Sequence, residues 1–143
     1  MEPSYKKAPD LTFSDIEEGK EYQFSRKITA EDVVKFAMLT GDFNPLHIDK
    51  EFGEKSKFKK NIVHGMLAGS LLSTLVGMHC PGKRSLYLSQ TLNFKAPLFN
   101  DDVVIVKGTV VSKNETTRLV TLRTEIIKNG KVCIYGQAKI KLL

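Results

Sequence analysis

The chain has no tryptophan, only two cysteines and five prolines in 143 residues, and no apolar run long enough to cross a membrane. Residues 61–82 contain no Asp, Glu, Lys or Arg, yet the densely apolar part spans only residues 66–78 and includes Ser70, Ser73 and Thr74. A bilayer core of about 30 Å requires about 20 apolar residues in a helix. This stretch therefore predicts a helix buried inside a protein, and we expect no membrane insertion.

The two cysteines, Cys80 and Cys133, stand alone. Neither belongs to a CxxC pair, and no secretory signal precedes the predicted fold. We interpret them as free thiols in a reducing compartment and expect a cytoplasmic protein. A disulfide between them is the less favoured alternative.

The formal net charge of +6 indicates either a solvated lysine-rich surface or an anionic partner. An anionic ligand, an acidic carrier protein and nucleic acid would all fit the sign. No compact basic run is interleaved with aromatic residues, and tryptophan, the best stacking platform for bases, is absent. We therefore expect no nucleic-acid binding.

The length, together with 41% hydrophobic and 27% charged residues, predicts a single globular domain over residues 1–143. Residues 1–10 carry two prolines and charges of both signs, and they are the one stretch for which we expect disorder.

Apolar periodicity predicts helices in the first half of the chain and strands in the second. Residues 22–28 alternate as a strand. Thr29 to Asp32 form a capping-box pattern that starts a helix ending at Gly41. A short helix capped by Asp49 follows. The helix at residues 64–78 is apolar on nearly every side, so we expect other structure to wrap it fully.

The second half predicts consecutive antiparallel strands at residues 86–94, 102–112, 118–128 and 131–141, with Asn129-Gly130 as a hairpin turn. The fold class is therefore α+β, with the sheet packed against the apolar helix. A sheet of about five strands has open edges, which a second subunit can cover. We expect a homodimer or a higher oligomer.

The segment Gly41-Asp42-Phe43-Asn44-Pro45-Leu46-His47 carries a carboxylate and an imidazole on a stretch stiffened by proline. Pro45 disfavours helix at Asn44, so we predict a loop through His47. Asp42 and His47 are five residues apart and would not share a helix face, but they can converge on a loop. Such a pair can remove one proton and deliver another.

A second motif, Ile62-Val63-His64-Gly65-Met66, enters the apolar helix at its N-terminus. Free backbone N–H groups and the helix dipole favour negative charge there, and Gly65 allows close approach of a ligand. A thioester carbonyl at this point would find a donor as its oxygen gains charge. Together the two motifs suit addition of water across an α,β-unsaturated thioester, through an enolate.

These residues resemble the MaoC-like dehydratase family, and within it the (R)-specific enoyl-CoA hydratases. The resemblance rests on residues 36–66, above all Gly41-Asp42-Phe43-Asn44-Pro45-Leu46-His47 followed by His64-Gly65, and continues through Tyr87-Leu88-Ser89-Gln90 and Phe94-Lys95-Ala96-Pro97. It implies a hot-dog fold, a homodimer, an enzyme of fatty acid metabolism that forms (R)-3-hydroxyacyl-CoA reversibly, and no metal or other cofactor.

The resemblance also assigns roles. Asp42 and His47 take the catalytic positions, Gly65 the oxyanion position, Asn44 the motif asparagine, and Ser73 a serine of the central helix near the catalytic pair. One departure is that the family usually has alanine or serine where this chain has Gly53, which we expect to loosen a helix.

Each assignment has a plainer interpretation. Asp42 can be a turn residue after Gly41, and His47 can be structural. His64 can bind substrate or simply pack at the helix start. Asn44 can orient a catalytic group or only precede a proline turn, and Ser73 can bond back to its own helix.

The function also has alternatives. A 3-hydroxyacyl-[acyl-carrier-protein] dehydratase would use identical residues on another carrier, and a thioesterase or a non-catalytic acyl-thioester-binding module is less favoured because the loop is intact. We expect the phosphopantetheine arm of the thioester near lysines 55, 57, 59 and 60, or near Lys83 and Arg84.

Overall fold

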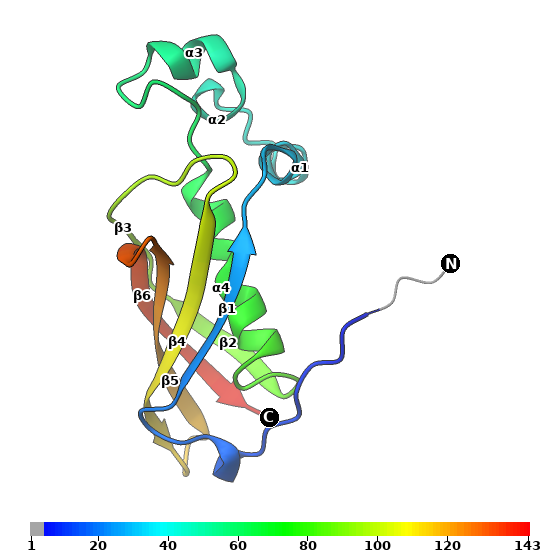
Figure 1. The fold of residues 1–143 in the computed structure, drawn as a ribbon. Coiled ribbons are helices and arrows are strands. Elements are labelled where there is room, and N and C mark those ends of the chain that lie inside the picture. The colour runs from blue at the N-terminus through cyan, green and yellow to red at the C-terminus, as the bar shows by residue number, and fades with distance from the viewer. Residues whose placement is uncertain (1–4) are drawn as a thin grey trace.

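Six strands form one antiparallel sheet that curves around the long helix α4 (Figure 1). The computed structural model describes residues 5–143. The strands lie in the order β1-β4-β5-β6-β2, and the short β3 also pairs with β6. The elements are η1 (Phe13–Asp15), β1 (Glu21–Lys27), α1 (Ala30–Thr40), α2 (Pro45–Ile48), α3 (Lys50–Lys55), α4 (Gly65–Met78), β2 (Ser85–Gln90), β3 (Asn93–Phe94), β4 (Val103–Asn114), β5 (Leu119–Lys128) and β6 (Lys131–Leu142).

The predicted α+β class and the antiparallel sheet are confirmed. The alternating residues of β5 form one buried face, as expected: Val120, Leu122, Thr124 and Ile126 are each at most 1% exposed. Leu72 and Leu75 of α4 share a buried cluster with Ile126, and Val76 of α4 shares a second one with Val120 and Leu122. Burying an aliphatic side chain of this size contributes roughly 1.5–3 kcal/mol to folding. The sheet and α4 therefore hold each other in place.

Two local predictions are confirmed by backbone geometry. Asn129 and Gly130 both have positive φ, 49° and 74°, as a tight hairpin between β5 and β6 requires. The Thr29 side chain accepts a hydrogen bond from Asp32 N–H, and the Asp32 carboxylate accepts one from Thr29 N–H. This capping box begins α1, and Gly41, with φ of 81°, ends it.

The described residues of this one chain do not by themselves cover α4 on every side. Its packed side is apolar, but Met66, Ser70, Ser73 and Thr74 form an exposed face. Three of these four residues carry hydroxyl groups, which are compatible with contact to solvent. The described residues contain no helix of the length and hydropathy that a bilayer crossing requires.

The single strand predicted over residues 86–94 is also wrong. β2 ends at Gln90, and two residues separate it from β3. Leu86 and Leu88, expected on the core side, are 45% and 52% exposed. Instead Tyr87 faces inward and donates a hydrogen bond to the Gln90 side chain, which in turn donates to Thr124. A register shift in the pairing of β2 with β6 lies between Tyr87 and Ser89, so that Tyr87 and Gln90 share the less exposed side and both leucines are exposed.

The N-terminal segment, for which we expected disorder over residues 1–10, lies in part outside the described residues, which begin at 5. Within the described part, Pro9 accepts a hydrogen bond from Lys83 N–H, and Asp10 forms an ion pair with Arg84. Residues 9 and 10 are thus attached to the turn after α4.

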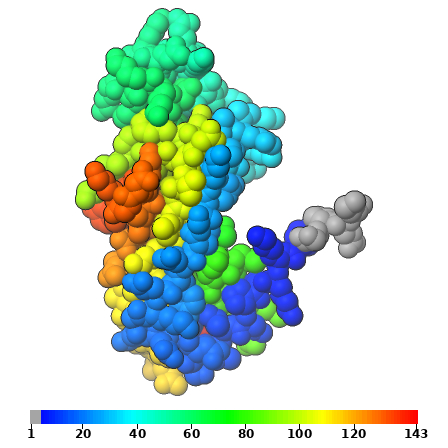
Figure 2. Space-filling view, viewed as in Figure 1, coloured from blue at the N-terminus to red at the C-terminus, as the bar shows by residue number. Residues whose placement is uncertain are grey.

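Helices α1, α2 and α3 gather at one end of the molecule (Figure 2). They lie at the end of the sheet where α4 begins (Figure 1). The two sequence motifs, one before α2 and one at the start of α4, are therefore brought to the same place.

Candidate active site

Local hydrogen bonds within the segment between α1 and α2 fix the position of the Asp42 carboxylate. The left-handed Gly41 reverses the chain after α1. The Asp42 N–H then donates to the Thr40 hydroxyl, and Asp42 Oδ1 accepts from Asn44 N–H at 3.1 Å. The side chain of Asp42 is 50% exposed, so its second oxygen stays accessible to a ligand.

The loop predicted through His47 ends earlier than expected. Asn44 is non-helical, as Pro45 requires, but Pro45 then begins a single helical turn that carries His47. Proline is well suited to the first position of a helix, where its missing N–H costs nothing. The Asn44 side chain caps this turn by accepting from Leu46 N–H at 3.0 Å. Asn44 therefore contacts both halves of the motif, Asp42 through its backbone and the His47 turn through its side chain.

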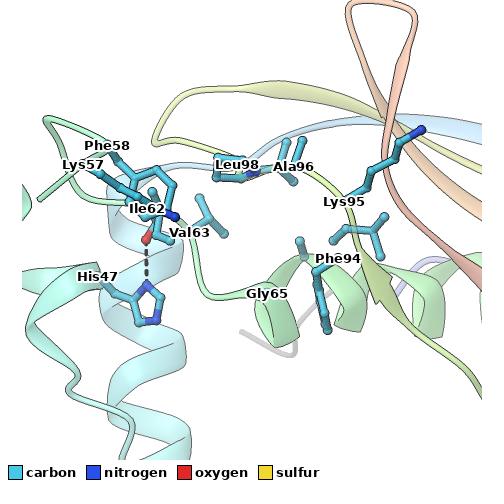
Figure 3. Close-up of a pocket in the computed structure, with 13 residues that line it drawn as sticks. His47, Lys57, Phe58, Ile62, Val63, Gly65, Phe94, Lys95, Ala96 and Leu98 are labelled. Carbon is cyan, nitrogen blue, oxygen red and sulfur yellow. Dashed lines mark hydrogen bonds between the residues drawn. The ribbon is translucent and has the colours of Figure 1, made fainter.

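The His47 imidazole is held in one tautomer. Its Nδ1 lies 2.8 Å from the carbonyl oxygen of Ile62, as the dashed line in Figure 3 shows. A carbonyl oxygen only accepts, so Nδ1 must carry the proton. The neutral ring then has its lone pair on Nε2. His47 is therefore poised to take a proton at that atom.

His64 lies behind the pair and is 2% exposed. Its Nε2 is 3.1 Å from the backbone oxygen of Asp42, and its ring packs against that of His47, with the centroids 3.9 Å apart and the planes tilted by 31°. Its Nδ1 is buried without a partner among the described residues, as expected for the unprotonated nitrogen of a neutral imidazole. This placement supports Asp42 and His47 from the protein side of the site.

Asp42, His47 and His64 each offer one atom, and these atoms lie within 4.8 Å of one another. That spacing lets one water bridge the carboxylate and the imidazole. The same set contains the residue types that bind divalent metals, although both histidines use one ring nitrogen in a hydrogen bond to a backbone oxygen. The geometry suits proton transfer through a shared water.

Gly65 is the first residue of α4, and no hydrogen bond between described residues uses its backbone N–H. The N-cap residue, His64, makes no side-chain cap. Free N–H groups at a helix start favour a negatively charged oxygen. A Cβ at position 65 would lie 2.8 Å from a ring carbon of Phe94, so a larger residue would require this ring to move.

A cavity of about 440 Å³ lies beside His47 and the start of α4, a size typical of small-ligand sites. His47 and Gly65 both line it, and its walls are mostly apolar. Lys57 and Phe58 lie at one side and Lys95 at another (Figure 3). An apolar group with an anionic end would match this lining.

The predicted basic cluster divides into different roles. Only Lys57 of the four lysines lines the cavity, whereas Lys55 pairs with Glu51 and Lys60 lies over the Phe99 ring. Lys83 and Arg84 face Asp10 beyond the other end of α4, about 20 Å from Gly65 by helix rise. Those two cations are therefore outside this cavity.

Ser73 is not brought to the pair within this chain. It is exposed on the open face of α4, about 12 Å along the helix from Gly65. Gly53 also differs from expectation, because it is a buried residue of α3 in direct contact with Asn61. Close packing accounts for the glycine better than a loosened helix does.

The sequence did not point to three residues of the site. Phe94, Lys95 and Asn61 come from segments whose local pattern is that of an ordinary strand end or loop. The only sequence signal was the similarity of Phe94-Lys95-Ala96-Pro97 to the family pattern, which gave no role for either side chain.

Comparison with known proteins identifies the family. A model of the MaoC like domain matches residues 13–130. An (R)-specific enoyl-CoA hydratase of Aeromonas caviae is 40% identical over 133 residues, which cover 92% of this chain and 99% of that protein.

Two solved structures agree with this assignment. The (R)-hydratase of A. caviae involved in PHA biosynthesis superposes with a TM-score of 0.86 at 41% identity, covering 90% of this chain and 98% of that one. The unliganded R-hydratase of Pseudomonas aeruginosa superposes with a TM-score of 0.89 at 31% identity, covering 93% and 86%. The fold is a hot-dog fold, and the chain belongs to the MaoC-like dehydratase family.

Proposed function

We propose that this protein is a hydro-lyase that adds water to trans-2-enoyl-CoA to give (R)-3-hydroxyacyl-CoA, and that it runs the reverse dehydration. The observation that carries the proposal is the His47 imidazole, which has an unprotonated Nε2 and lines a cavity together with Gly65. One ring nitrogen of His47 lies within 4.8 Å of a carboxylate oxygen of Asp42. The similarity to (R)-specific enoyl-CoA hydratases supports the same reaction.

The reaction needs one base, one acid and one oxyanion donor. Nε2 of His47 takes a proton from water as the water oxygen attacks C3. Electrons move onto the thioester oxygen, where the Gly65 N–H stabilises the enolate. His47 then passes this proton to the Asp42 carboxylate, and the resulting carboxyl group protonates C2. The hydroxyl of the water is then on C3 and its proton on C2, and both residues are back in their starting state.

The remaining residues orient this set. Asn44 holds the Asp42 carboxylate with its N–H and caps the turn carrying His47. His64 binds the Asp42 backbone and packs against the His47 ring. Ser73 completes the site only if a second subunit presents its own α4 at the cavity, which the exposed position of this residue allows.

The carrier is recognised by charge at the cavity rim. Lys57 and Lys95 flank the opening and suit the phosphates of coenzyme A. An acidic acyl carrier protein would fit the same lysines, so a 3-hydroxyacyl-[acyl-carrier-protein] dehydratase is the second candidate.

The protein acts as a homodimer in the cytoplasm, without a metal or other cofactor. The apolar residues Leu86, Leu88 and Met66 are each at least 45% exposed, on an edge strand and on the open face of α4, and a second copy would cover them. Two buried free thiols suit a reducing compartment.

The test is a hydration assay on crotonyl-CoA and longer trans-2-enoyl-CoAs, followed by the loss of enoyl absorbance. Chiral analysis of the product should give the (R) isomer. The same acyl groups on acyl carrier protein form the second arm, and a much higher kcat/KM there would favour the second candidate. Release of free thiol without hydration on either carrier would show a thioesterase and reject both.

A further inference from the structure

The side-chain amide of Asn61 occupies the junction between α2 and α3. Its nitrogen, Nδ2, lies 2.8 Å from the carbonyl oxygen of Asp49, 3.0 Å from that of Leu46 and 3.3 Å from that of Pro45. All three neighbours are acceptors, so the amide must present its NH₂ group and not its oxygen. The two N–H bonds of the amide donate to the two nearer carbonyl oxygens, those of Asp49 and Leu46. The more distant Pro45 oxygen shares one of these hydrogens.

These contacts matter because α2 is a single helical turn. A turn of four residues is not stable by itself, since helix nucleation is unfavourable. At the start of α2, the Asn44 side chain accepts a hydrogen bond from the Leu46 N–H, and the Asn61 amide donates to carbonyl oxygens of the turn, among them that of Leu46. The orientation of His47, which lies on this turn, therefore depends on a residue fourteen positions later in the chain.

The next residue, Ile62, links Asn61 to the imidazole directly. Its N–H donates to the Leu46 carbonyl at 3.3 Å, and its own carbonyl accepts from Nδ1 of His47 at 2.8 Å. A displacement of Asn61 would move the Ile62 carbonyl as well. The tautomer of His47 and the position of its ring would then be fixed less firmly.

Gly53 provides the space that Asn61 needs. A Cβ at position 53 would lie 2.6 Å from both the backbone nitrogen and Nδ2 of Asn61, and 2.9 Å from the carbonyl carbon of Lys60. Two of these three atoms belong to the backbone and cannot rotate away. Any larger residue at 53 would push residues 60 and 61 away from α3.

We propose that Asn61 is a positioning residue for His47, and that position 53 is glycine because the Asn61 bridge requires it. This proposal rests on the proposed function, in which His47 is the base. Asn61 touches no reacting atom, and it acts by holding the turn and the Ile62 carbonyl that orient the ring.

The main variant is Asn61→Asp, which keeps the side-chain shape but removes both N–H donors and faces three carbonyl oxygens with negative charge. Asn61→Ala is the second variant if the first folds poorly. Each should lower kcat about 10- to 100-fold with KM changed much less, because a misplaced catalytic group loses rate before it loses binding. Gly53→Ala should produce the same pattern.

The matched control is Asn114→Ala. Asn114 is an exposed asparagine whose side chain also bonds to the backbone, accepting from Thr117 N–H, but it lies in the distant β4–β5 turn. Its kcat should stay at the wild-type value. In a His47→Gln background, Asn61→Ala should cause no further loss, since it acts through the missing ring. A loss that persists in that background would overturn the positioning role.

A readout independent of activity is the ¹⁵N spectrum of the His47 ring at alkaline pH. Wild type should show protonated Nδ1 and unprotonated Nε2, and Asn61→Asp should show mixed tautomers. An unchanged His47 tautomer together with kcat within twofold of the control would overturn the proposal. If wild type hydrates no enoyl thioester, the proposed function fails, yet this spectrum still decides whether Asn61 positions His47. Wild-type kcat in Gly53→Ala would reject the explanation for the glycine.

Discussion

The Nδ1 atom of His47 lies 2.8 Å from the carbonyl oxygen of Ile62, fifteen residues further along the chain. This bond joins the Gly41–His47 motif to the segment that begins α4. It also determines the chemistry of the ring, because the bonded nitrogen holds the proton and the other nitrogen holds the lone pair. One backbone oxygen therefore prepares the imidazole as a base before any substrate binds.

The same bond leads to a prediction about metals. Asp42, His47 and His64 are spaced closely enough to hold a divalent ion, but hydration by proton transfer requires none. Dialysis against EDTA should leave kcat unchanged, whereas added Zn²⁺ should inhibit by occupying Nε2 of His47 and the carboxylate. Loss of activity on chelation, with recovery on adding back one metal, would contradict this prediction.

A second prediction concerns the rim lysines. If Lys57 and Lys95 attract the phosphates of the carrier, Lys57→Ala and Lys95→Ala should each raise KM by about 1.5- to 5-fold, the range that exposed ion pairs support. KM of wild type should also rise with salt, because exposed charges are screened. Lys139→Ala, at an exposed position of β6, is the control. A KM indifferent to salt and to both substitutions would reject the electrostatic contribution.

A third prediction concerns assembly. The exposed edge strand β2 carries Leu88, which is 52% exposed. Sedimentation should show a dimer or larger species at micromolar concentration, and Leu88→Glu should weaken it by placing a charge in the apolar contact. Ser112→Glu, at an exposed position of β4, should have no such effect. A fully active wild-type monomer would count against the dimer.

A fourth prediction follows from Cys80, which is fully buried at the end of α4. Burial raises the pKa of its thiol to about 11, above its ordinary value of 9.0. Between these values the unfolded chain loses the proton and the folded chain keeps it, so the unfolded state binds fewer protons and stability falls as pH rises. Below pH 9 this contribution is fully present.

Urea unfolding at pH 8, 9, 10 and 11 measures the effect. The free energy of unfolding should fall across the window, and Cys80→Ala should show a shallower fall. Burial also raises the pKa of Tyr87, to about 12, so part of the slope should remain in that variant. Equal slopes for the two proteins would show that Cys80 does not contribute.

Much of the fold followed from the sequence because its signals are local. The capping box at Thr29, the Asn129-Gly130 turn and the alternation in β5 each depend on residues a few positions apart. The predictions that failed concern residues whose orientation depends on contacts with residues far away in the sequence. Leu86 and Leu88 alternate like core residues, yet the pairing with β6 shifts register between Tyr87 and Ser89, and Tyr87 and Gln90 lie inward instead.

The site divides in the same way. The convergence of Asp42 and His47, and the place of Gly65 at the start of α4, could be predicted because two compact motifs carry these residues. The tautomer of His47 could not, since it depends on a carbonyl fifteen residues away. The reason for a glycine at position 53 could not be predicted either. A Cβ there would collide with atoms of Asn61, which is eight residues further along the chain.

The central claim is that Asp42 and His47 act as one acid–base unit on a shared water. Steady-state hydration of crotonyl-CoA by Asp42→Asn, His47→Gln and the double variant tests it directly, with folding checked by circular dichroism. Each single variant should lose at least about 10²-fold in kcat with a smaller change in KM, and the double variant should be little worse than the worse single one. An Asp42→Asn protein that keeps more than about a tenth of wild-type kcat would contradict the account.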